Sequence, residues 1–541
     1  MIKDHSSKKK TPTLTDQDLE KQDLEKQDLE KIEKQLAVKL SDQLWRLNNL
    51  YYIKDDRGQV IKFKLNWAQQ ILFDKLWYLN VILKARQLGI TTFFCILFLD
   101  NVLFKGLDAG LIAHTLQDAI KIFDTKIKYA WDRLPEIIKE GYDVNTENVR
   151  ELKFNNKATD VQSSIYVGTS LRSGTVQRLH ISELSTLDQK YPAKAEEIKT
   201  GALNTVHAGQ VITIESTAKG PAGVFYDICN TAMDQDKMKK TLTELDYKPF
   251  FFPWWKHPEY QLKGDVVLPR EMNDYFTKME LDTGHKFTRE QRSWYYKKYS
   301  IQKDAMKSEF PTTPDEAFLA NVEGSYFGKQ MDKVMEQNRI TRVPWEPSIP
   351  VDTWWDLGTS KQRKDATSIV FTQTIGLEIR IIDFYGNSGE GFIHYKNVMD
   401  EKGYVYGTHN GPHDLEVTEL GTGKTRIEIA QKLGINFQIV PRLSFADGIE
   451  ATRIVLNKCW FDEANTNELV KALISFRKEW DEKLGRFKDK PLKDWASDPA
   501  DAFRYMSIGH REHKRLGYYS DEELMIEREN EDDKGVLNPF A

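Results

Sequence analysis

"VILKARQLGITT" (residues 81–92) is the stretch that decides the fold of the first half of the chain. It follows the outline of a phosphate-binding loop, GxxxxGK[ST], in which glycines let the backbone approach phosphate, lysine contacts the β- and γ-phosphates and a hydroxyl binds Mg²⁺. Gly89, Thr91 and Thr92 fit this pattern. The match is partial, and a turn that merely joins a strand to a helix explains the loop alone about as well.

Two positions in the loop depart from the pattern. Lys84 stands at the first glycine position and Ile90 at the lysine position. The loop nevertheless follows the apolar residues VIL and opens an apolar helix, whose first N–H groups and positive end attract an anion. Lys84 and Arg86 lie in the first turn of the loop and can supply the missing positive charge from the other side. We therefore predict that this loop still binds phosphate.

Apolar strands alternate with helical stretches along this half of the chain. The strand candidates are NVILKA, DAGLIAHT, QRLHISEL and QVITIEST, and each ends in a polar or glycine-containing turn. This alternation is typical of a parallel sheet with crossover helices. A second α/β pattern begins at VDTWWDLG and continues through ATSIVFTQ and EIRIIDFYG, where Gly376 suits a hairpin. Two α/β domains in tandem are expected.

An acidic residue follows the strand candidate RLHIS. Hydrolysis of ATP needs a strand that ends in acids, one for Mg²⁺ and one to orient water. Here Glu183 is the single acid, with Ser182 in the preceding position. An ordinary surface glutamate is the alternative. Upstream, Gln69 in NWAQQ is a candidate for hydrogen bonding to an adenine edge, although a helical glutamine is usually only solvated.

Composition sets the class of protein. The chain has 541 residues, 40% of them hydrophobic and 29% charged, which is ordinary for a globular protein of several domains. The net charge of -5 gives no global positive field, so any contact with nucleic acid must be local. The three cysteines stand far apart, which excludes CxxC metal spacing and indicates reduced thiols. The best apolar run, FFCILFLDNVLF, is interrupted by Asp100, so we expect neither export nor a membrane span.

Changes of pattern along the chain predict five segments. The first carries an unbroken QDLEK repeat whose leucines advance around a helix, so it is a solvated helix or flexible arm and not a coiled-coil seam. An aromatic, proline-punctuated stretch separates the two α/β patterns, and a charged tail ends the chain. The predicted segments are an arm (1–60), a first α/β domain (61–245), a connecting region (246–345), a second α/β domain (346–512) and a tail (513–541).

The second domain presents acids suited to metal-dependent cleavage of phosphodiesters. That chemistry uses carboxylates that converge on two divalent ions, one activating water and one stabilising the leaving oxygen. Asp356 ends the first strand candidate, Asp414 follows a Gly-Pro turn, and Asp501 lies in the helical DPADAFRY. We predict that these three hold Mg²⁺ or Mn²⁺. Asp365 and Asp498 are reserve candidates, and Asp498 can instead cap the last helix.

Eight motifs together carry a resemblance to a known family. They are FKLNWAQ, ILKARQLGITT, RLHISEL, IESTAKGPAGVFY, EFPTTPDEAF, WWDLG, GPHD and DPADAFRY, and in this order and spacing they resemble the large terminase subunit of tailed bacteriophages. The resemblance spans residues 63–508. It implies an α/β fold with a P-loop, ASCE-type ATPase domain at 61–245, followed by an RNase H-like nuclease domain at 346–512.

The resemblance also assigns roles to particular residues. It implies that Glu183 is catalytic in ATP hydrolysis and that Ser216 and Thr217 couple hydrolysis to domain movement. Ser182 stands where the family usually has the Walker B aspartate, and Ile90 where it usually has lysine. For the nucleotide it implies contacts from a group of loop and helix residues, namely Gln69 to adenine and Lys84, Arg86, Gly89, Thr91 and Thr92 at the phosphates, with Arg86 also catalytic.

The function that the resemblance implies is a motor that uses ATP to move double-stranded viral DNA into procapsids, and a metal-dependent endonuclease that cuts concatemeric DNA. Implied partners are DNA, the portal protein, the small terminase subunit and further copies of the chain, as a pentamer on the procapsid. The implied location is the host cytoplasm and, transiently, the portal vertex. Two alternatives stay open: a helicase-like or repair ATPase-nuclease, and a structural adaptor at a capsid vertex with decayed sites.

Overall fold

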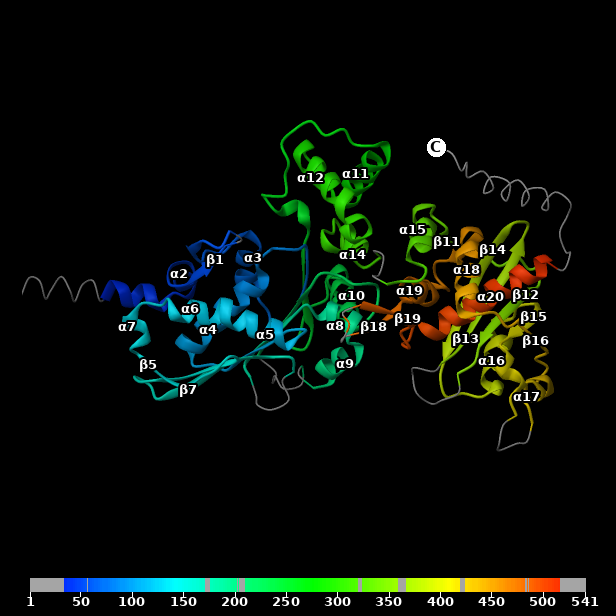
Figure 1. The fold of residues 1–541 in the computed structure, drawn as a ribbon, viewed down its shortest axis with the longest axis horizontal. Helices are drawn as coiled ribbons and strands as arrows, with labels where there is room; N and C mark the ends of the chain where they lie inside the picture. Colours follow the sequence, from blue (N-terminus) through cyan, green and yellow to red (C-terminus); the bar gives the residue numbers. More distant parts are fainter. Residues whose placement is uncertain are drawn as a thin grey trace, which may run out of the picture.

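The computed structural model has two α/β bodies joined by a helical stretch, and Figure 1 shows them side by side along the long axis of the molecule. The structure describes residues 34–55, 57–170, 176–201, 203, 210–319, 324–358, 366–418, 424–481, 484 and 486–515. The QDLEK repeat, the reserve candidate Asp365 and nearly all of the predicted tail lie outside the described residues. None of the described helices combines the length and apolar character needed to cross a membrane.

The first body is built on a mostly parallel sheet. In the described part of the chain its strand order is β10-β3-β9-β8-β4-β7-β6-β5. Neighbouring strands from β10 to β7 pair in parallel, whereas β6 pairs antiparallel with both β7 and β5. One strand, β9, separates the loop strand β3 from β8, as expected of an ASCE-type ATPase. The strands are β3 (Leu79–Lys84), β4 (Ala109–Ile112), β5 (Tyr142–Glu147), β6 (Glu151–Asn156), β7 (Val161–Gly168), β8 (Arg178–Ser182), β9 (Val211–Ser216) and β10 (Tyr247–Phe252).

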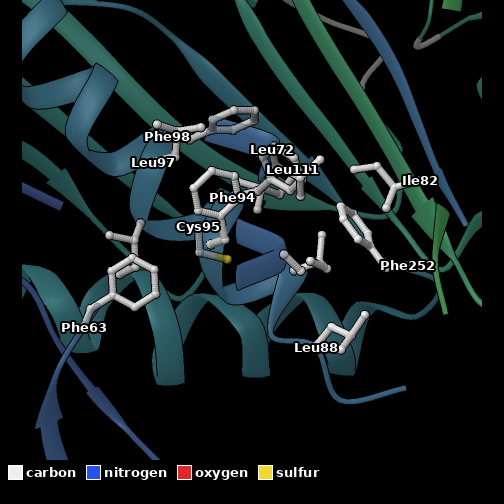
Figure 2. Packing of buried hydrophobic residues seen from close by; sticks show 14 of the residues in the cluster. Phe63, Leu72, Ile82, Leu88, Phe94, Cys95, Leu97, Phe98, Leu111 and Phe252 are labelled. Atoms are coloured by element: carbon white, nitrogen blue, oxygen red, sulfur yellow. The ribbon is translucent and has the colours of Figure 1, made fainter. Parts of the chain in front are cut away.

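Helices cover both faces of this sheet because side chains along each strand alternate between the faces. Ile82 packs into one core with the helix that follows the loop, and Figure 2 shows Phe94 and Phe98 of that helix in this core. Val81 and Leu83 pack into the opposite core. The helices of this body are α2 (Gln43–Asn49), α3 (Trp67–Lys75), α4 (Ile90–Lys105), α5 (Leu116–Ile122), the π-helix η1 (Phe123–Lys128), α6 (Tyr129–Asp132), α7 (Glu136–Lys139), α8 (Leu184–Lys190), α9 (Pro192–Thr200) and α10 (Val224–Lys237). A small antiparallel pair, β1 (Tyr52–Lys54) and β2 (Val60–Lys62), lies before α3.

A helical module, residues 254–319, follows β10. Its α11 and α12 project beyond the sheet in Figure 1, and its aromatic side chains continue the core that surrounds α4. Trp254 is fully buried there and stacks on Phe287. The elements of the module are η3 (Trp254–Lys256), α11 (Arg270–Thr283), α12 (Arg289–Gln302), η4 (Lys303–Ala305), α13 (Met306–Glu309) and α14 (Pro314–Leu319).

The second body has a mixed sheet with the order β11-β17-β14-β13-β12-β15-β16. Its centre is an antiparallel meander, β12-β13-β14, with β15 and β16 added parallel beside β12, as expected of an RNase H-like domain. The strands are β11 (Ile340–Thr341), β12 (Val351–Asp356), β13 (Thr367–Ile375), β14 (Glu378–Asn387), β15 (Tyr406–Gly411), β16 (Phe437–Ile439) and β17 (Cys459–Asp462). The predicted hairpin is confirmed: Gly376, between β13 and β14, has a φ of +60°.

Helices also cover both faces of the second sheet. Trp355 faces a core with α16 and α17, whereas Trp354 faces a core with α15 and α18 to α20. A separate hairpin, β18 (Lys478–Asp481) with β19 (Arg486–Pro491), precedes the last helix. The helices are α15 (Gly328–Glu336), α16 (Phe392–Lys402), η5 (His413–Glu416), α17 (Arg426–Lys432), α18 (Phe445–Val455), η6 (Leu456–Lys458), α19 (Asn467–Ser475) and α20 (Ser497–Arg515).

Two predicted domain limits need correction. Strand β10 falls in the predicted connecting region, yet it is the edge strand of the first sheet, where Pro249 pairs with Val81. Proline lacks an N–H and is tolerated at such an edge. At the other end of the predicted connecting region, Phe327 and Met331 are already buried in the core of the second body. The second body therefore begins before residue 346.

Candidate functional site

The loop after β3 leads into helix α4, whose start has no side-chain cap. Gly89 is the N-cap of α4, with a left-handed φ of +67°, and no side chain bonds the first N–H groups of the helix. The amide of Gln69 supports the loop from behind, since its Nε2 donates to the Gly89 carbonyl at 2.9 Å and its Oε1 accepts from Asn66 N at 3.0 Å. Gln69 thus belongs to the scaffold of the loop, and its contact with adenine stays a prediction.

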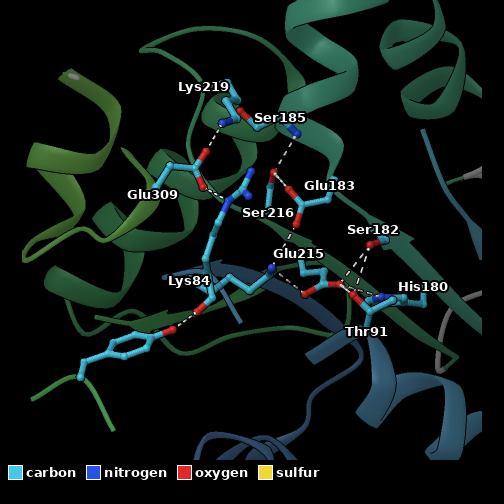
Figure 3. A network of polar contacts seen from close by, with 12 residues as sticks. Lys84, Thr91, His180, Ser182, Glu183, Ser185, Glu215, Ser216, Lys219 and Glu309 are labelled. Atoms are coloured by element: carbon cyan, nitrogen blue, oxygen red, sulfur yellow. Dashed lines mark hydrogen bonds and ion pairs between the residues drawn. The ribbon is translucent and has the colours of Figure 1, made fainter. Parts of the chain in front are cut away.

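Lys84 is buried at the end of β3 and faces two carboxylates of the protein. Its Nζ lies 3.0 Å from Glu183 Oε1 and 3.5 Å from Glu215 Oε2. Figure 3 shows the Lys84 side chain pointing toward these carboxylates. Burial alone would lower the pKa of Lys84, but the two carboxylates outweigh it and raise that pKa. The structure therefore places the charge of Lys84 between two acids, and its contact with phosphate stays a prediction.

Glu215 is the residue that sequence reasoning missed. It lies on β9, its side chain is fully buried, and Thr91 Oγ1 and Ser182 Oγ both donate to its Oε1. His180 Nε2 lies 3.3 Å from the same oxygen. Burial would raise the pKa of Glu215, but the Lys84 ammonium, the contact with His180 and the hydrogen bond from Thr91 hold that pKa below its usual range. A charged group inside the apolar run VITIES was the available signal.

Glu183 sits at the N-cap of α8 in a strained backbone conformation. Its φ of 58° and ψ of 46° are left-handed, which costs a non-glycine residue about 1–3 kcal/mol. Ser216 Oγ donates to Glu183 Oε2 at 3.2 Å and accepts from Ser185 N at 3.2 Å. The predicted catalytic acid and the predicted coupling residue are therefore in direct contact, at the ends of neighbouring strands.

Two further cations lie beside this centre and share one acid. Arg86 Nε and Lys219 Nζ each form an ion pair with a different oxygen of Glu309. Lys219 belongs to the turn after β9, and Glu309 ends α13 of the helical module. The side chain of Arg86 is 58% exposed and that of Glu309 only 8%. Thr92, the remaining predicted phosphate residue, accepts a hydrogen bond from Lys126 at 2.5 Å.

A cavity of about 1290 Å³ opens over these groups. Lys84, Arg86 and Glu183 line it from the first body, and Glu309 lines it from the helical module. Side chains of the second body, among them Arg453, form its far wall. The cavity thus combines clustered cations with space for a nucleotide, and the uncapped start of α4 follows the same loop, a set that fits a phosphate-bearing ligand.

The acids of the second body are only partly brought together. Asp356 lies at the end of β12 and Asp501 on α20. Burial is the largest cause that raises the pKa of Asp356, and the charges of Asp501 and Asp498 raise it further. Asp501 also pairs with Arg504 at 3.1 Å. Asp498 is buried, and its Oδ2 accepts from Ala366 N at 2.7 Å.

Asp414 lies on an exposed turn, and burial together with the charges of Asp356, Asp501 and Asp414 raises the pKa of Tyr505, so all three predicted ligands act on one side chain. Asp414 lies in the η5 turn after β15, the parallel neighbour of β12, and its side chain is 56% exposed and contacts His413. Among the described residues, no group of three or more His, Cys, Asp or Glu side chains is arranged to hold a metal ion. The donor chemistry still fits divalent cations, because Asp356, Asp498 and Asp501 repel one another and a cation would relieve that repulsion.

No family model and no curated protein sequence matches the chain. Solved structures do match it. The crystal structure of the HK97 bacteriophage large terminase covers 86% of this chain and 98% of its own, at 10% identity and a TM-score of 0.39. The structure resembles large terminases of bacteriophages. The Thermus phage P74-26 large terminase ATPase domain covers 46% of this chain and 94% of its own, at 15% identity and a TM-score of 0.30.

A second domain-level match falls on a nuclease. The P22 large terminase nuclease domain covers 32% of this chain and 89% of its own, at 13% identity and a TM-score of 0.25. Because these identities and TM-scores are low, the function proposed below rests on the residues of this chain and on the topology of its two sheets.

Proposed function

We propose that the chain is a large terminase subunit, in which the first body hydrolyses ATP to move double-stranded DNA into a procapsid and the second body cuts that DNA. The observation that carries the proposal is the centre formed by Lys84, Glu183 and Glu215. Three neighbouring parallel strands bring these charges together beside Thr91 in the first turn of α4, and Lys84 and Glu183 line the cavity.

For ATP hydrolysis, we assign the water-orienting base to Glu183. Its carboxylate lies at the edge of the cavity and is 29% exposed, so it can reach a water molecule, whereas Glu215 is fully enclosed. Thr91 lies in the first turn of α4 and is the residue that would hold Mg²⁺, and Glu215 is its hydrogen-bond partner. Arg86, Gly89 and the first N–H groups of α4 would bind the phosphates.

For DNA cleavage, we assign Asp356, Asp414 and Asp501 to divalent metal binding. A bound Mg²⁺ or Mn²⁺ would supply charge neutralisation and an activated water molecule. Asp356 and Asp501 are already neighbours, and Asp414 lies at the end of the next parallel strand, on an exposed turn. The partners we propose are DNA, the portal protein, the small terminase subunit and further copies of the chain, a pentamer on the procapsid.

The test is to measure both activities on the purified full-length chain. We expect ATP hydrolysis that depends on Mg²⁺, and cutting of plasmid DNA that depends on Mg²⁺ or Mn²⁺ and needs no ATP. Absence of both activities would favour the structural adaptor. Strand separation on forked DNA, together with no uptake of DNA into procapsids, would favour the helicase-like or repair enzyme.

A further inference from the structure

Three of the cations that line the cavity are paired with carboxylates of the protein. Lys84 faces Glu183 and Glu215, while Arg86 and Lys219 both face Glu309. The second of these groups differs from the first, because its acid comes from the helical module and not from the strands of the sheet. Its two cations therefore meet a carboxylate that is not part of the phosphate loop.

The geometry of Glu309 is that of a bridging oxyanion. Its Oε2 pairs with the Arg86 guanidinium and its Oε1 with the Lys219 ammonium. Carboxylate and phosphate oxygens accept the same charge-assisted hydrogen bonds from arginine and lysine. A phosphate group in the cavity would therefore need the same two cations that Glu309 now engages.

We propose that Arg86 and Lys219 form a clamp for the terminal phosphate of the nucleotide, and that Glu309 occupies this clamp until the nucleotide displaces it. The proposal rests on the proposed function of the site and adds Lys219 as a phosphate-binding residue and Glu309 as its internal competitor.

The backbone around the clamp allows this exchange without loss of the fold. Arg86 N donates to the Glu309 carbonyl at 3.0 Å, and Tyr260 Oη donates to the Arg86 carbonyl at 2.7 Å. These two bonds hold the helical module to the main chain of Arg86 and leave the Arg86 side chain out. The Arg86 side chain, which is more than half exposed, can turn toward a phosphate while the module stays in place.

The experiment compares nucleotide affinities of the full-length wild type and Glu309→Gln by calorimetry, with ATPγS, ADP and AMP as ligands. Glutamine removes the competing charge and keeps the size of the side chain. We expect ATPγS to bind roughly tenfold more tightly to the variant, the equivalent of about 1.4 kcal/mol, and AMP to bind as it does to the wild type. The control is Glu280→Gln, which breaks a 2.8 Å ion pair with Arg292 in the same module but outside the cavity.

A second variant guards against a folding defect in the first. Lys219→Met should weaken ATPγS binding by a similar factor and leave AMP binding unchanged, and the double variant should lose most of the gain given by Glu309→Gln. If the wild type binds ATPγS and Glu309→Gln binds it equally or more weakly, the clamp is refuted while the proposed function stands. If the wild type binds none of the three nucleotides, both fail.

Discussion

The ammonium of Lys84 lies 3.0 Å from the carboxylate of Glu183, so a buried cation at the end of β3 and an acid at the end of β8 neutralise each other across β9. This pair joins the phosphate loop to the acid that we assign as the base for hydrolysis. A change at either residue should therefore affect the other.

Replacing Glu183 by glutamine should abolish ATP turnover. The amide cannot take a proton from water, and removal of a positioned base typically costs 10²–10⁴-fold. ATPγS binding should survive, because Glu215 still compensates the charge of Lys84. Steady-state ATPase and nucleotide-binding assays on the same preparation check both statements. ATP turnover at the wild-type rate would remove Glu183 from the mechanism.

Lys84→Ala should destabilise the fold, whereas Arg86→Ala should not. Loss of the buried ammonium leaves Glu215 enclosed without its ion pair, and breaking a buried pair in this way costs about 3–5 kcal/mol. Arg86 is 58% exposed, and loss of an exposed partner costs about 1 kcal/mol or less. Urea unfolding of both variants measures the difference. Equal stabilities would mean that the Lys84 pairs contribute little.

Asp188 should make the stability of the first body depend on pH. It is buried, its carboxylate caps α10 by accepting from Val224 N and Phe225 N, and burial raises its pKa from 3.8 to about 7. The folded state then holds its proton more tightly than the unfolded state, so stability falls as pH rises from about 4 to 7.

The measurement for Asp188 is the difference in unfolding free energy between the wild type and Asp188→Asn at several pH values. Over this range the wild type should lose stability relative to the variant by up to about 1.4 kcal/mol per pH unit. A difference that does not change between pH 4 and 7 would contradict the raised pKa of Asp188.

Asn substitutions at Asp356, Asp414 and Asp501 should each reduce plasmid cutting by orders of magnitude. Asparagine removes a charge that hard divalent cations require, and the change lies outside the first body, so ATPase activity should persist. Asp356→Asn should not lower the melting temperature of the metal-free protein, because it relieves repulsion from Asp501 and Asp498. Plasmid nicking with Mg²⁺ or Mn²⁺, with and without chelator, is the readout.

Asp498→Asn decides which acid of α20 belongs to the metal site. Asp498 accepts a hydrogen bond from the backbone N–H of Ala366, which favours a structural role. Asp501 is partly exposed and pairs with Lys493 and Arg504. We expect Asp498→Asn to lower stability and Asp501→Asn to lower cutting. A variant at Asp498 that is folded but inactive, beside an active Asp501→Asn, would reverse the assignment.

Much of the fold follows from local sequence, and the centre of the site does not. Apolar runs that end in polar turns predicted the strands correctly, and Gly376 predicted its hairpin, because these signals act over a few residues. Strand β10 was missed since Pro249 is typical of a connection, and only its edge position in the sheet makes it a strand.

Glu215 illustrates the other limit. Its partners Lys84, Thr91 and His180 come from three separate strands and helices, so only the folded sheet shows why a carboxylate is tolerated in an apolar run. The same holds for Glu309, whose partners Arg86 and Lys219 are distant along the chain.

Uptake of DNA into purified procapsids that carry their portal tests the central claim most directly. DNA that becomes resistant to added DNase is measured after incubation with the wild-type chain and ATP, with Glu183→Gln as the matched inactive motor. The account predicts protected DNA with wild type and ATP, and none with Glu183→Gln or without ATP. Protection by Glu183→Gln equal to that of the wild type, or no protection by a wild type that hydrolyses ATP normally, would contradict it.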